Sequence, residues 1–217
     1  MDTICIIPAR GGSKRLPGKN ILPLAGLPLI AHSIQYAMRH RDLVGEVIVS
    51  TDDDAIASVA ADYGARVVRR PAHLSGDHEP TVTALEHVLQ IVPANRVVLL
   101  QPTNPLRPDG LLEDAIHIAN QKNCDVFTVS QSHHKLGTIQ NDRFVPYNYT
   151  PGQRSQDLEP LYYENGLLYI CSANAIARKT VITPQAFPLV TDHPFAGVDI
   201  DTADDFLYAE YLINKNK

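Results

Sequence analysis

The chain has 217 residues, of which 44% are hydrophobic and 20% charged, and its formal net charge is -5. This predicts one globular domain over residues 1–217, and the acidic balance argues against nucleic acid or another polyanion as a general partner. No apolar run reaches the roughly 20 residues of a membrane-spanning helix, and the amino terminus lacks the basic region of a signal peptide. Cys5, Cys124 and Cys171 are far apart and adjoin expected strands, which indicates buried, reduced thiols in a cytoplasmic protein.

Short β-branched runs alternate with helical patterns, which predicts an α/β fold. The expected strands are Thr3–Pro8, Glu46–Ser50, Arg66–Val68, Arg96–Leu100, Asp125–Ser130, Leu167–Cys171 and Gly197–Ile200. Apolar stripes at helical spacing lie within 29–38, 82–92 and 111–119. Helices are expected to start at Asp52 or Asp53, at Thr81, and at Thr202 with Asp205. We therefore expect a Rossmann-like, mainly parallel sheet with helices on both faces.

The stretch 133–165 breaks this alternation, because it is polar, rich in Tyr, Pro and Gln, and has little helical periodicity. A loop this long in a compact domain is usually functional or part of an interface. We therefore expect a small β-hairpin or arm here, which contributes to a substrate pocket or to a dimer contact.

The loop after the first expected strand is the most informative segment. Residues 8–20 place four cations and three glycines together in a protein that is acidic as a whole. Glycines let backbone N–H groups approach phosphate oxygens, while Arg and Lys neutralise phosphate charge. The loop therefore predicts a site for a compact, highly charged phosphate ligand. The alternative is an ordinary solvated turn with a basic patch.

Two common phosphate motifs are excluded by counting. A P-loop has four residues between its glycines and a Ser or Thr after its lysine, whereas five residues separate Gly12 from Gly18 and Asn20 follows Lys19. The dinucleotide fingerprint is also absent, because Gly11 and Gly12 have no third glycine at the required spacing.

The carboxyl ends of the expected parallel strands gather the loop at 10–20, the segment 101–105 and the acidic pair Asp199 and Asp201 into one crevice. Strand period two would put both carboxylates on one face, which is unfavourable unless a cation lies between them. Magnesium prefers one or two carboxylates with waters and substrate phosphates, so we predict a magnesium site. A helix-capping Asp201 beside a solvated Asp199 is the alternative. The cluster at 52–54 is assigned mainly to helix capping.

Four segments together resemble the acylneuraminate cytidylyltransferases, or CMP-sialic acid synthetases, in the nonulosonic acid branch. They are the loop Ile7–Asn20, the segment Leu100–Arg107, Glu164-Asn165-Gly166, and Asp199-Ile200-Asp201-Thr202 with Asp205-Phe206. The resemblance runs from residue 4 to about residue 210. It implies a fold of the nucleotide-diphospho-sugar transferase type.

The resemblance also implies an activity and a site. A cytidylyl group would pass from CTP to the anomeric hydroxyl of a nine-carbon α-keto acid sugar in a homodimeric enzyme that uses Mg²⁺ or Mn²⁺. The implied CTP-binding residues are Ala9, Arg10, Gly11, Ser13, Lys14, Lys19, Asn20, Arg70 and Thr81. Gln101, Tyr163 and Glu164 would contact the sugar, and Asp199 and Asp201 would bind the metal. Arg10, Lys14, Lys19 and Asp201 would carry the chemistry.

Two alternatives stay open at this stage. The 3-deoxy-manno-octulosonate cytidylyltransferases share the first motif, although they resemble this chain less around Gly11–Lys14. An inactive nucleotide-binding module could also use this fold, because fold does not fix function. The sequence leaves sialic, legionaminic and pseudaminic acids open as the nine-carbon acceptor.

Overall fold

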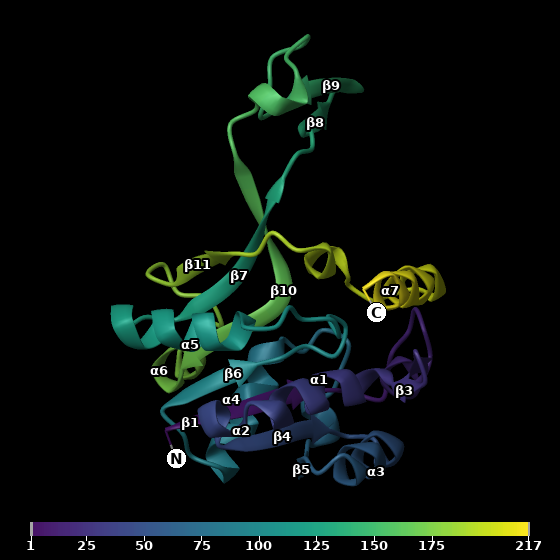
Figure 1. Ribbon diagram of the computed structural model, residues 1–217, viewed down its shortest axis with the longest axis vertical. Coiled ribbons are helices and arrows are strands. Elements are labelled where there is room, and N and C mark those ends of the chain that lie inside the picture. Colours follow the sequence, from purple (N-terminus) through teal and green to yellow (C-terminus); the bar gives the residue numbers. More distant parts are fainter. Residues whose placement is uncertain (1, 217) are drawn as a thin grey trace.

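A computed structural model describes residues 2–216 and shows a seven-stranded sheet in the order β11-β7-β10-β6-β1-β4-β5 (Figure 1). The strands are β1 (Thr3–Pro8), β4 (Glu46–Thr51), β5 (Arg66–Arg69), β6 (Arg96–Leu99), β7 (Val126–Ser132), β10 (Leu161–Ser172) and β11 (Phe187–Val190). Only β10 runs against its neighbours β6 and β7, and the other pairs are parallel. The predicted α/β fold with a mainly parallel sheet is confirmed.

Two expectations about the strands need correction. β10 begins six residues earlier than expected, at Leu161, and pairs antiparallel with both neighbours. Gly197–Ile200 is not a strand, because Pro194–Gly197 forms a 3-10 turn (η4) and the next residues pair with no strand. The remaining expected strands are present.

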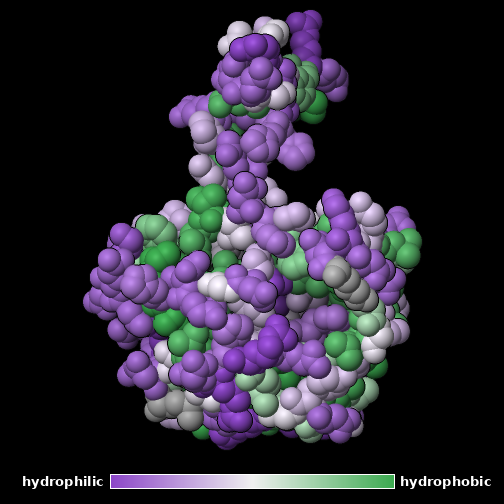
Figure 2. Space-filling view, in the orientation of Figure 1, coloured by the Kyte–Doolittle hydropathy of each residue, from purple (hydrophilic) through white to green (hydrophobic). Residues whose placement is uncertain are grey.

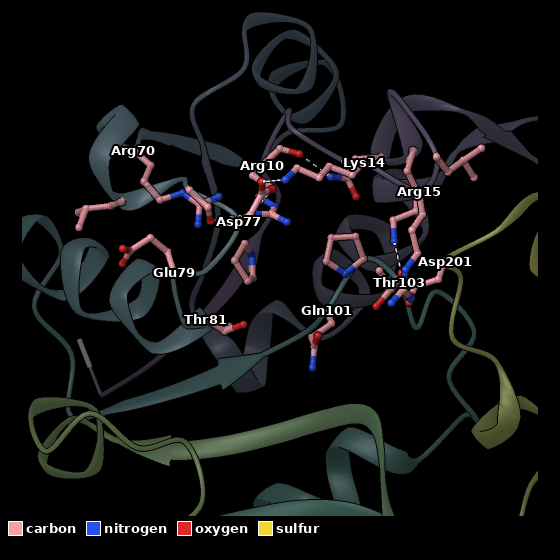
Figure 3. A pocket seen from close by; sticks show the side chains of 18 residues that line it. Arg10, Lys14, Arg15, Arg70, Asp77, Glu79, Thr81, Gln101, Thr103 and Asp201 are labelled. Atoms are coloured by element: carbon pink, nitrogen blue, oxygen red, sulfur yellow. Dashed lines mark hydrogen bonds and ion pairs between the residues drawn. The ribbon is translucent and has the colours of Figure 1, made fainter.

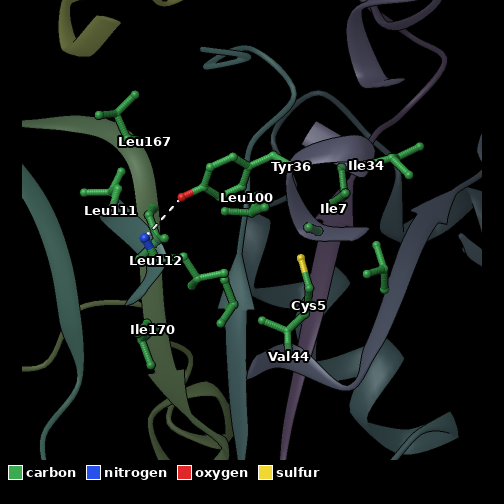
Figure 4. Close-up of a cluster of buried hydrophobic side chains, with 14 of the residues drawn as sticks. Cys5, Ile7, Ile34, Tyr36, Val44, Leu100, Leu111, Leu112, Leu167 and Ile170 are labelled. Atoms are coloured by element: carbon green, nitrogen blue, oxygen red, sulfur yellow. Dashed lines mark hydrogen bonds between the residues drawn. The ribbon is translucent and has the colours of Figure 1, made fainter. Parts of the chain in front are cut away.

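Helices cover both faces of the sheet, as predicted (Figure 1). The helices of the described chain are α1 (Leu29–Arg39), α2 (Arg41–Val44), α3 (Asp54–Asp62), α4 (Thr81–Ile91), α5 (Leu111–Lys122), α6 (Ala173–Ala177) and α7 (Ala203–Lys215), of which α7 lies beside the sheet and not on one of its faces. β1 shows why two layers form, because its successive side chains point to opposite faces. Cys5 and Ile7 lie in a buried cluster with side chains of α1 and α5 (Figure 4), whereas Ile4 and Ile6 lie in a cluster with side chains of α4 and α6. Within residues 2–216, no helix is long and apolar enough to cross a membrane.

A third apolar cluster fastens the C-terminal part of the chain to the sheet domain. Val198 and Ile200 are buried there with Leu24, Leu106 and Leu212, the last of which lies on α7. Burial of these two side chains explains the apolar–polar alternation that predicted a strand. It is tertiary packing, and not a strand ladder, that fixes the acidic segment.

The stretch 133–165 contains the expected β-hairpin, made of β8 (Gly137–Gln140) and β9 (Arg143–Pro146). It stands on the ends of β7 and β10 and projects away from the sheet (Figure 1). Hydrophobic side chains show on this arm between hydrophilic ones (Figure 2). Within the arm, Ile139 is 71% exposed and Tyr147 is 74% exposed.

Candidate functional site

A cavity of about 440 Å³ lies at the carboxyl ends of β1, β5 and β6 (Figure 3). Its walls are the loop after β1, the segment 70–81 between β5 and α4, and the start of the loop after β6. Asp201, which lies just before α7, completes the lining. Five cations and three carboxylates line it: Arg10, Lys14, Arg15, Lys19, Arg70, Asp77, Glu79 and Asp201. The cavity is therefore positively charged in an acidic protein, which suits a polyanionic ligand.

The cavity brings together most of the residues that the sequence assigned to CTP. They are Arg10, Ser13, Lys14, Lys19, Asn20, Arg70 and Thr81. Ala9 and Gly11 do not line it. Ala9 is buried, and its N–H donates to the carbonyl of Ser50 at 2.9 Å. These two residues shape the loop from beneath.

Gly11 lies against the start of α3. Its N–H donates to Asp52 Oδ1 at 3.1 Å, and a Cβ at this position would come within 2.7 Å of the Asp53 carboxylate. Asp53 caps α3, because its side chain accepts the N–H of Ile56 at 2.9 Å. The prediction that this acidic cluster caps a helix is thus confirmed for Asp53. Asp52 instead accepts a hydrogen bond from Gly11 in the basic loop after β1.

Lys19 forms the buried end of the basic cavity. Gly18 takes a positive φ of 67° and starts the 3-10 turn (η1) at Lys19–Ile21. The Lys19 ammonium donates to Asp201 Oδ1 at 2.8 Å and to the carbonyl of Ile200 at 2.6 Å. Arg15 donates to the other oxygen of Asp201 at 2.6 Å. Asp201 therefore bridges two cations.

At the other end of the cavity, Asp77 bridges Arg10 and Lys14. The Arg10–Asp77 distance is 3.3 Å, and Arg10 Nη1 also donates to the carbonyl of Gly76 at 2.6 Å. The hydrogen bond from Lys14 is the main cause that holds the pKa of the Asp77 carboxyl below its usual value. The ionised carboxylate of Asp77 is thus paired with Arg10 and Lys14, two residues that were predicted to bind phosphate.

Arg70 follows β5 and is 9% exposed. Its backbone N–H donates to the carbonyl of Thr51 at 2.8 Å. Within residues 2–216, its side-chain Nε has no hydrogen-bond partner. Burial lowers the pKa of this guanidinium, and the nearby Asp52 acts in the opposite direction. An orphaned donor on a cavity wall is costly in the absence of a ligand acceptor.

A second cavity of about 410 Å³ adjoins the basic one, and Gln101 lines both. Its other walls include Tyr163, Glu164 and Tyr169 of β10 and Asp199. The Tyr169 hydroxyl donates to Glu164 Oε2 at 3.1 Å. Burial, followed by the charge of Glu164, raises the pKa of Tyr169. The predicted sugar-contacting residues thus lie together, beside the predicted phosphate site.

The irregular stretch of β10 between Glu164 and Tyr169 packs closely against the loop after β6. Gly166 has a φ of +75°, and a Cβ there would come within 2.7 Å of Asn104 Oδ1. Asn104 Nδ2 donates to the carbonyls of Asn165 at 3.1 Å and Val198 at 2.9 Å. Asn104 thereby joins the sugar-side wall to the acidic segment.

The acidic pair is divided between the two cavities. Asp199 lines the second cavity and Asp201 the first. The N–H of Ile200 donates to the carbonyl of Thr103 at 2.8 Å, which fixes this segment beside Gln101. Thr202 caps α7 in a capping box with Asp205. The alternative that Asp201 caps this helix is therefore wrong.

The donor set is compatible with a magnesium ion that also has phosphate ligands. Asp199 is exposed and has no hydrogen bond or ion pair within the described chain, so its oxygens are available. Asp201 carries the paired carboxylate at the edge of the cationic cavity. Within residues 2–216, no group of three or more His, Cys, Asp and Glu side chains is placed to hold a metal. Two carboxylates are nevertheless enough where waters and phosphates complete the shell.

Several site residues were missed from the sequence. Arg15 belongs to the basic loop, and its charge was the available signal. Asp77 and Glu79 lie in a polar loop with no motif of their own, although it joins Arg70 to Thr81. Only the fold shows that this loop faces the residues after β1.

Comparisons with known proteins agree with this geometry. A family model described as cytidylyltransferase matches residues 4–205. The chain is 35% identical to a CMP-N,N'-diacetyllegionaminic acid synthase of Legionella pneumophila and 31% identical to a pseudaminic acid cytidylyltransferase of Campylobacter jejuni. Each alignment covers 100% of this chain and 98% of the relative. An N-acylneuraminate cytidylyltransferase of Streptococcus agalactiae is 35% identical over 96% of the chain, which spans 52% of that relative.

Solved structures show the same fold at lower identity. A CMP:2-keto-3-deoxy-manno-octonic acid synthetase complexed with CTP aligns with a TM-score of 0.75, 18% identity and full coverage of both chains. A 4-diphosphocytidyl-2C-methyl-D-erythritol synthase from Anaerococcus prevotii aligns with a TM-score of 0.69 and 14% identity, over 98% of this chain and 96% of its own.

A cationic cavity at the carboxyl ends of a mainly parallel sheet defines an α/β protein with a cavity suited to a polyanionic ligand. Within that class, the chain belongs to the cytidylyltransferase family.

Proposed function

We propose that this protein transfers a cytidylyl group from CTP to the anomeric hydroxyl of a nonulosonic acid, giving a CMP-sugar and pyrophosphate. The observation that carries the proposal is the pair of adjoining cavities that share Gln101. The first is cationic, and the second is lined by hydrogen-bonding side chains such as Tyr163 and Glu164. Relatives at 31–35% identity are named for sialic, legionaminic and pseudaminic acids, which supports this class of acceptor.

The reaction would place the negative charge of the triphosphate and of the departing pyrophosphate beside the cations of the first cavity. The acceptor oxygen forms a bond to the α-phosphorus of CTP, and the bond from that phosphorus to the bridging oxygen breaks. The electron pair leaves with pyrophosphate, and the acceptor hydroxyl gives up its proton to solvent. Arg10, Lys14 and Lys19 would hold the phosphates and stabilise the departing pyrophosphate. Positioning and electrostatic stabilisation carry most of such catalysis.

The proposal includes magnesium or manganese, which Asp199 and Asp201 would hold together with phosphate oxygens. When bound, such an ion supplies Lewis-acid polarisation of a phosphoryl oxygen and lowers the pKa of a nearby hydroxyl. The chain's own contribution is geometric, because Thr103 and Asn104 fasten the backbone of the acidic segment between the two cavities.

Arg70 and Thr81 are proposed to recognise the cytosine base. Arg70 is buried on the wall of the basic cavity, and its Nε has no partner within residues 2–216. Cytosine offers a carbonyl oxygen and a ring nitrogen as acceptors, which suit a guanidinium donor. Within the basic loop after β1, Asn20 Nδ2 donates to the carbonyl of Arg10 at 3.0 Å. This hydrogen bond joins the two ends of that loop.

A homodimer is also proposed, with the arm at 133–165 as the contact. Exposed apolar side chains gather on the arm, including Ile139, Phe144 and Tyr147. Such exposure on a projecting element is typical of an interaction surface. The cytoplasmic location expected from the cysteines stays a prediction.

The direct test is turnover by the purified protein with CTP and magnesium chloride. Each nonulosonic acid and, for comparison, the eight-carbon 3-deoxy-manno-octulosonic acid is supplied as acceptor, and pyrophosphate and the CMP-sugar are measured. Product with a nine-carbon acid supports the proposal, whereas product with the eight-carbon acid alone supports the related activity. Thermal stabilisation by CTP without turnover on any acceptor would indicate an inactive nucleotide-binding module.

A further inference from the structure

The loop between β5 and α4 crosses the basic cavity. Prolines at 71 and 80 bound it, and Leu74, Gly76, Asp77 and Glu79 line the cavity. Within residues 2–216, its polar contacts with Arg10 and Lys14 are made by the carboxylate of Asp77 and the carbonyl of Gly76. Figure 3 shows Asp77 beside both cations. Arg10 is thus directed toward this loop.

The ion pairs of the cavity fall into two sets of different strength. Asp201 binds Arg15, whose side chain is 75% exposed, but it also binds Lys19, whose side chain is only 10% exposed and donates to the carbonyl of Ile200 as well. Asp77 binds Lys14, whose side chain is 77% exposed, and Arg10, whose side chain is 33% exposed. Exposed pairs contribute little free energy and exchange partners easily. Asp77 has no partner as buried as Lys19, so it is more easily displaced from its cations than Asp201.

A polyphosphate that uses Arg10 and Lys14 must compete with this carboxylate. Both cations can bind phosphate oxygens more strongly than one carboxylate, because a polyphosphate carries several charges and acceptors. The displaced Asp77 would then lie near a ligand of the same charge, and like charges repel. Displacement of Asp77 therefore lowers the affinity of every ligand that must bind both Arg10 and Lys14.

We propose that Asp77 is an internal anion that occupies part of the polyphosphate site and sets the affinity of the cavity for polyphosphate ligands. The inference rests on the proposed function for the identity of the ligand. Asp77 thereby weakens the binding of triphosphate and pyrophosphate, the leaving group, without touching the reacting atoms. A nucleoside that lacks phosphates does not compete with it.

Asp77→Asn tests the inference by removing the charge at nearly constant size. The variant and the wild type are titrated calorimetrically with inorganic tripolyphosphate, with and without magnesium chloride, and with cytidine. Tripolyphosphate is expected to bind the variant about threefold to tenfold more tightly, since two exposed ion pairs are lost. Cytidine affinity is expected to stay unchanged.

Two further variants make the result specific. Asp77→Glu keeps the charge and should bind tripolyphosphate much as the wild type does. Glu86→Gln removes a carboxylate whose side chain is as exposed as Asp77, 32%, but which pairs with Lys179 outside the cavity. It should leave tripolyphosphate affinity unchanged.

The outcomes separate the inference from the proposed function. If the wild type binds tripolyphosphate and Asp77→Asn binds it equally or more weakly, Asp77 orients the cations and the inference is overturned alone. If neither protein binds tripolyphosphate under either condition, the proposed polyphosphate site is overturned together with the inference.

Discussion

The ammonium group of Lys19 donates to the carboxylate of Asp201 at 2.8 Å, although 182 residues separate them in the chain. The contact joins the loop after β1 to the segment before α7, so distant parts of the sequence build one wall of the basic cavity. Arg15 binds the second oxygen of the same carboxylate. Asp201 therefore has two roles: it compensates a buried cation, and it presents oxygen to the cavity.

Asp201→Asn is expected to lower kcat by about 100-fold or more, because electrostatic groups at a phosphoryl-transfer site contribute on that scale. The amide still accepts from Lys19, and Asp201 is partly exposed, so the fold should be retained. Pyrophosphate release and thermal unfolding are the measurements. Asp204→Asn, an exposed change three residues further on, is the matched control and should keep full activity. Near wild-type turnover of Asp201→Asn would sink the assignment.

Gly166→Ala is expected to destabilise the protein by about 1–3 kcal/mol, because it adds strain at positive φ to a clash. The clash is with Asn104, so the wall of the second cavity should shift and KM for the acceptor sugar should rise. Gly26→Ala isolates the strain, since Gly26 has a φ of +86° and no atom within 4 Å of its added Cβ. Urea unfolding and steady-state kinetics compare the two. Equal effects of both changes would contradict a specific role for the Asn104 contact.

The sheet was predictable where local patterns and tertiary packing agree. β1, β4 and β6 are buried on both faces and bounded by turn residues, so their apolar runs were sufficient. The segment 197–200 was not predictable, because Val198 and Ile200 are buried by α7 and the loop after β6, which no local pattern contains. The first part of β10 was missed because residues 161–164 are largely exposed and pair with β7 alone, so they form no buried apolar run.

The site residues also fall into those that could be predicted from local sequence patterns and those that could not. The basic loop was predictable, because charge and glycine are concentrated within a few residues. Asp77 was not predictable, since its partners Arg10 and Lys14 lie more than 60 residues away and its own neighbours form no motif. The division of Asp199 and Asp201 between two cavities likewise depends on packing that a strand pattern does not contain.

Asp205 predicts a loss of stability in acid. Burial alone would raise the pKa of its carboxyl, but hydrogen bonds from Asp201 and Thr202 and the charge of Lys19 outweigh burial and lower it. The folded state therefore favours the ionised form. This contribution is fully present above the unfolded pKa and is lost as pH falls through the lower folded value. Between pH 7 and pH 3, the difference in Tm between wild type and Asp205→Asn should shrink toward the acid end. A difference that stays constant would contradict this account.

The arm predicts the oligomeric state. Ile139→Asp places a charge among exposed apolar side chains on β8 and should convert a dimer to a monomer in sedimentation velocity. Thr138→Asp adds the same charge on the opposite face of the hairpin, because successive side chains alternate. It should leave the dimer intact if the Ile139 face is the contact. A wild type that sediments as a monomer at all concentrations would rule out the proposed dimer.

Arg107 is a buried cation, and its hydrogen-bond partners within residues 2–216 are all neutral. Its guanidinium donates to the carbonyls of Leu167 at 2.7 Å and Gln101 at 2.9 Å and to Ser33 Oγ at 3.0 Å. It also lies over the ring of Tyr36. Burial lowers the pKa of Arg107 to about 10, and the same burial would lower the pKa of a lysine at this position. The three acceptors therefore suit the branched guanidinium of an arginine, which stays charged at neutral pH.

Arg107→Lys is expected to cost about 1–3 kcal/mol at pH 7, since one ammonium cannot reach all three acceptors. Its folded-state pKa would lie below that of the unfolded lysine, so the unfolded state binds more protons between the two values. The stability of the variant should therefore rise relative to wild type as pH increases from 7 toward 10. Urea unfolding across this range is the measurement. Arg39→Lys, at an exposed arginine over the same Tyr36 ring, should show a small difference that is independent of pH. A pH-independent deficit in Arg107→Lys would mean that lost hydrogen bonds, and not the buried charge, account for the whole effect.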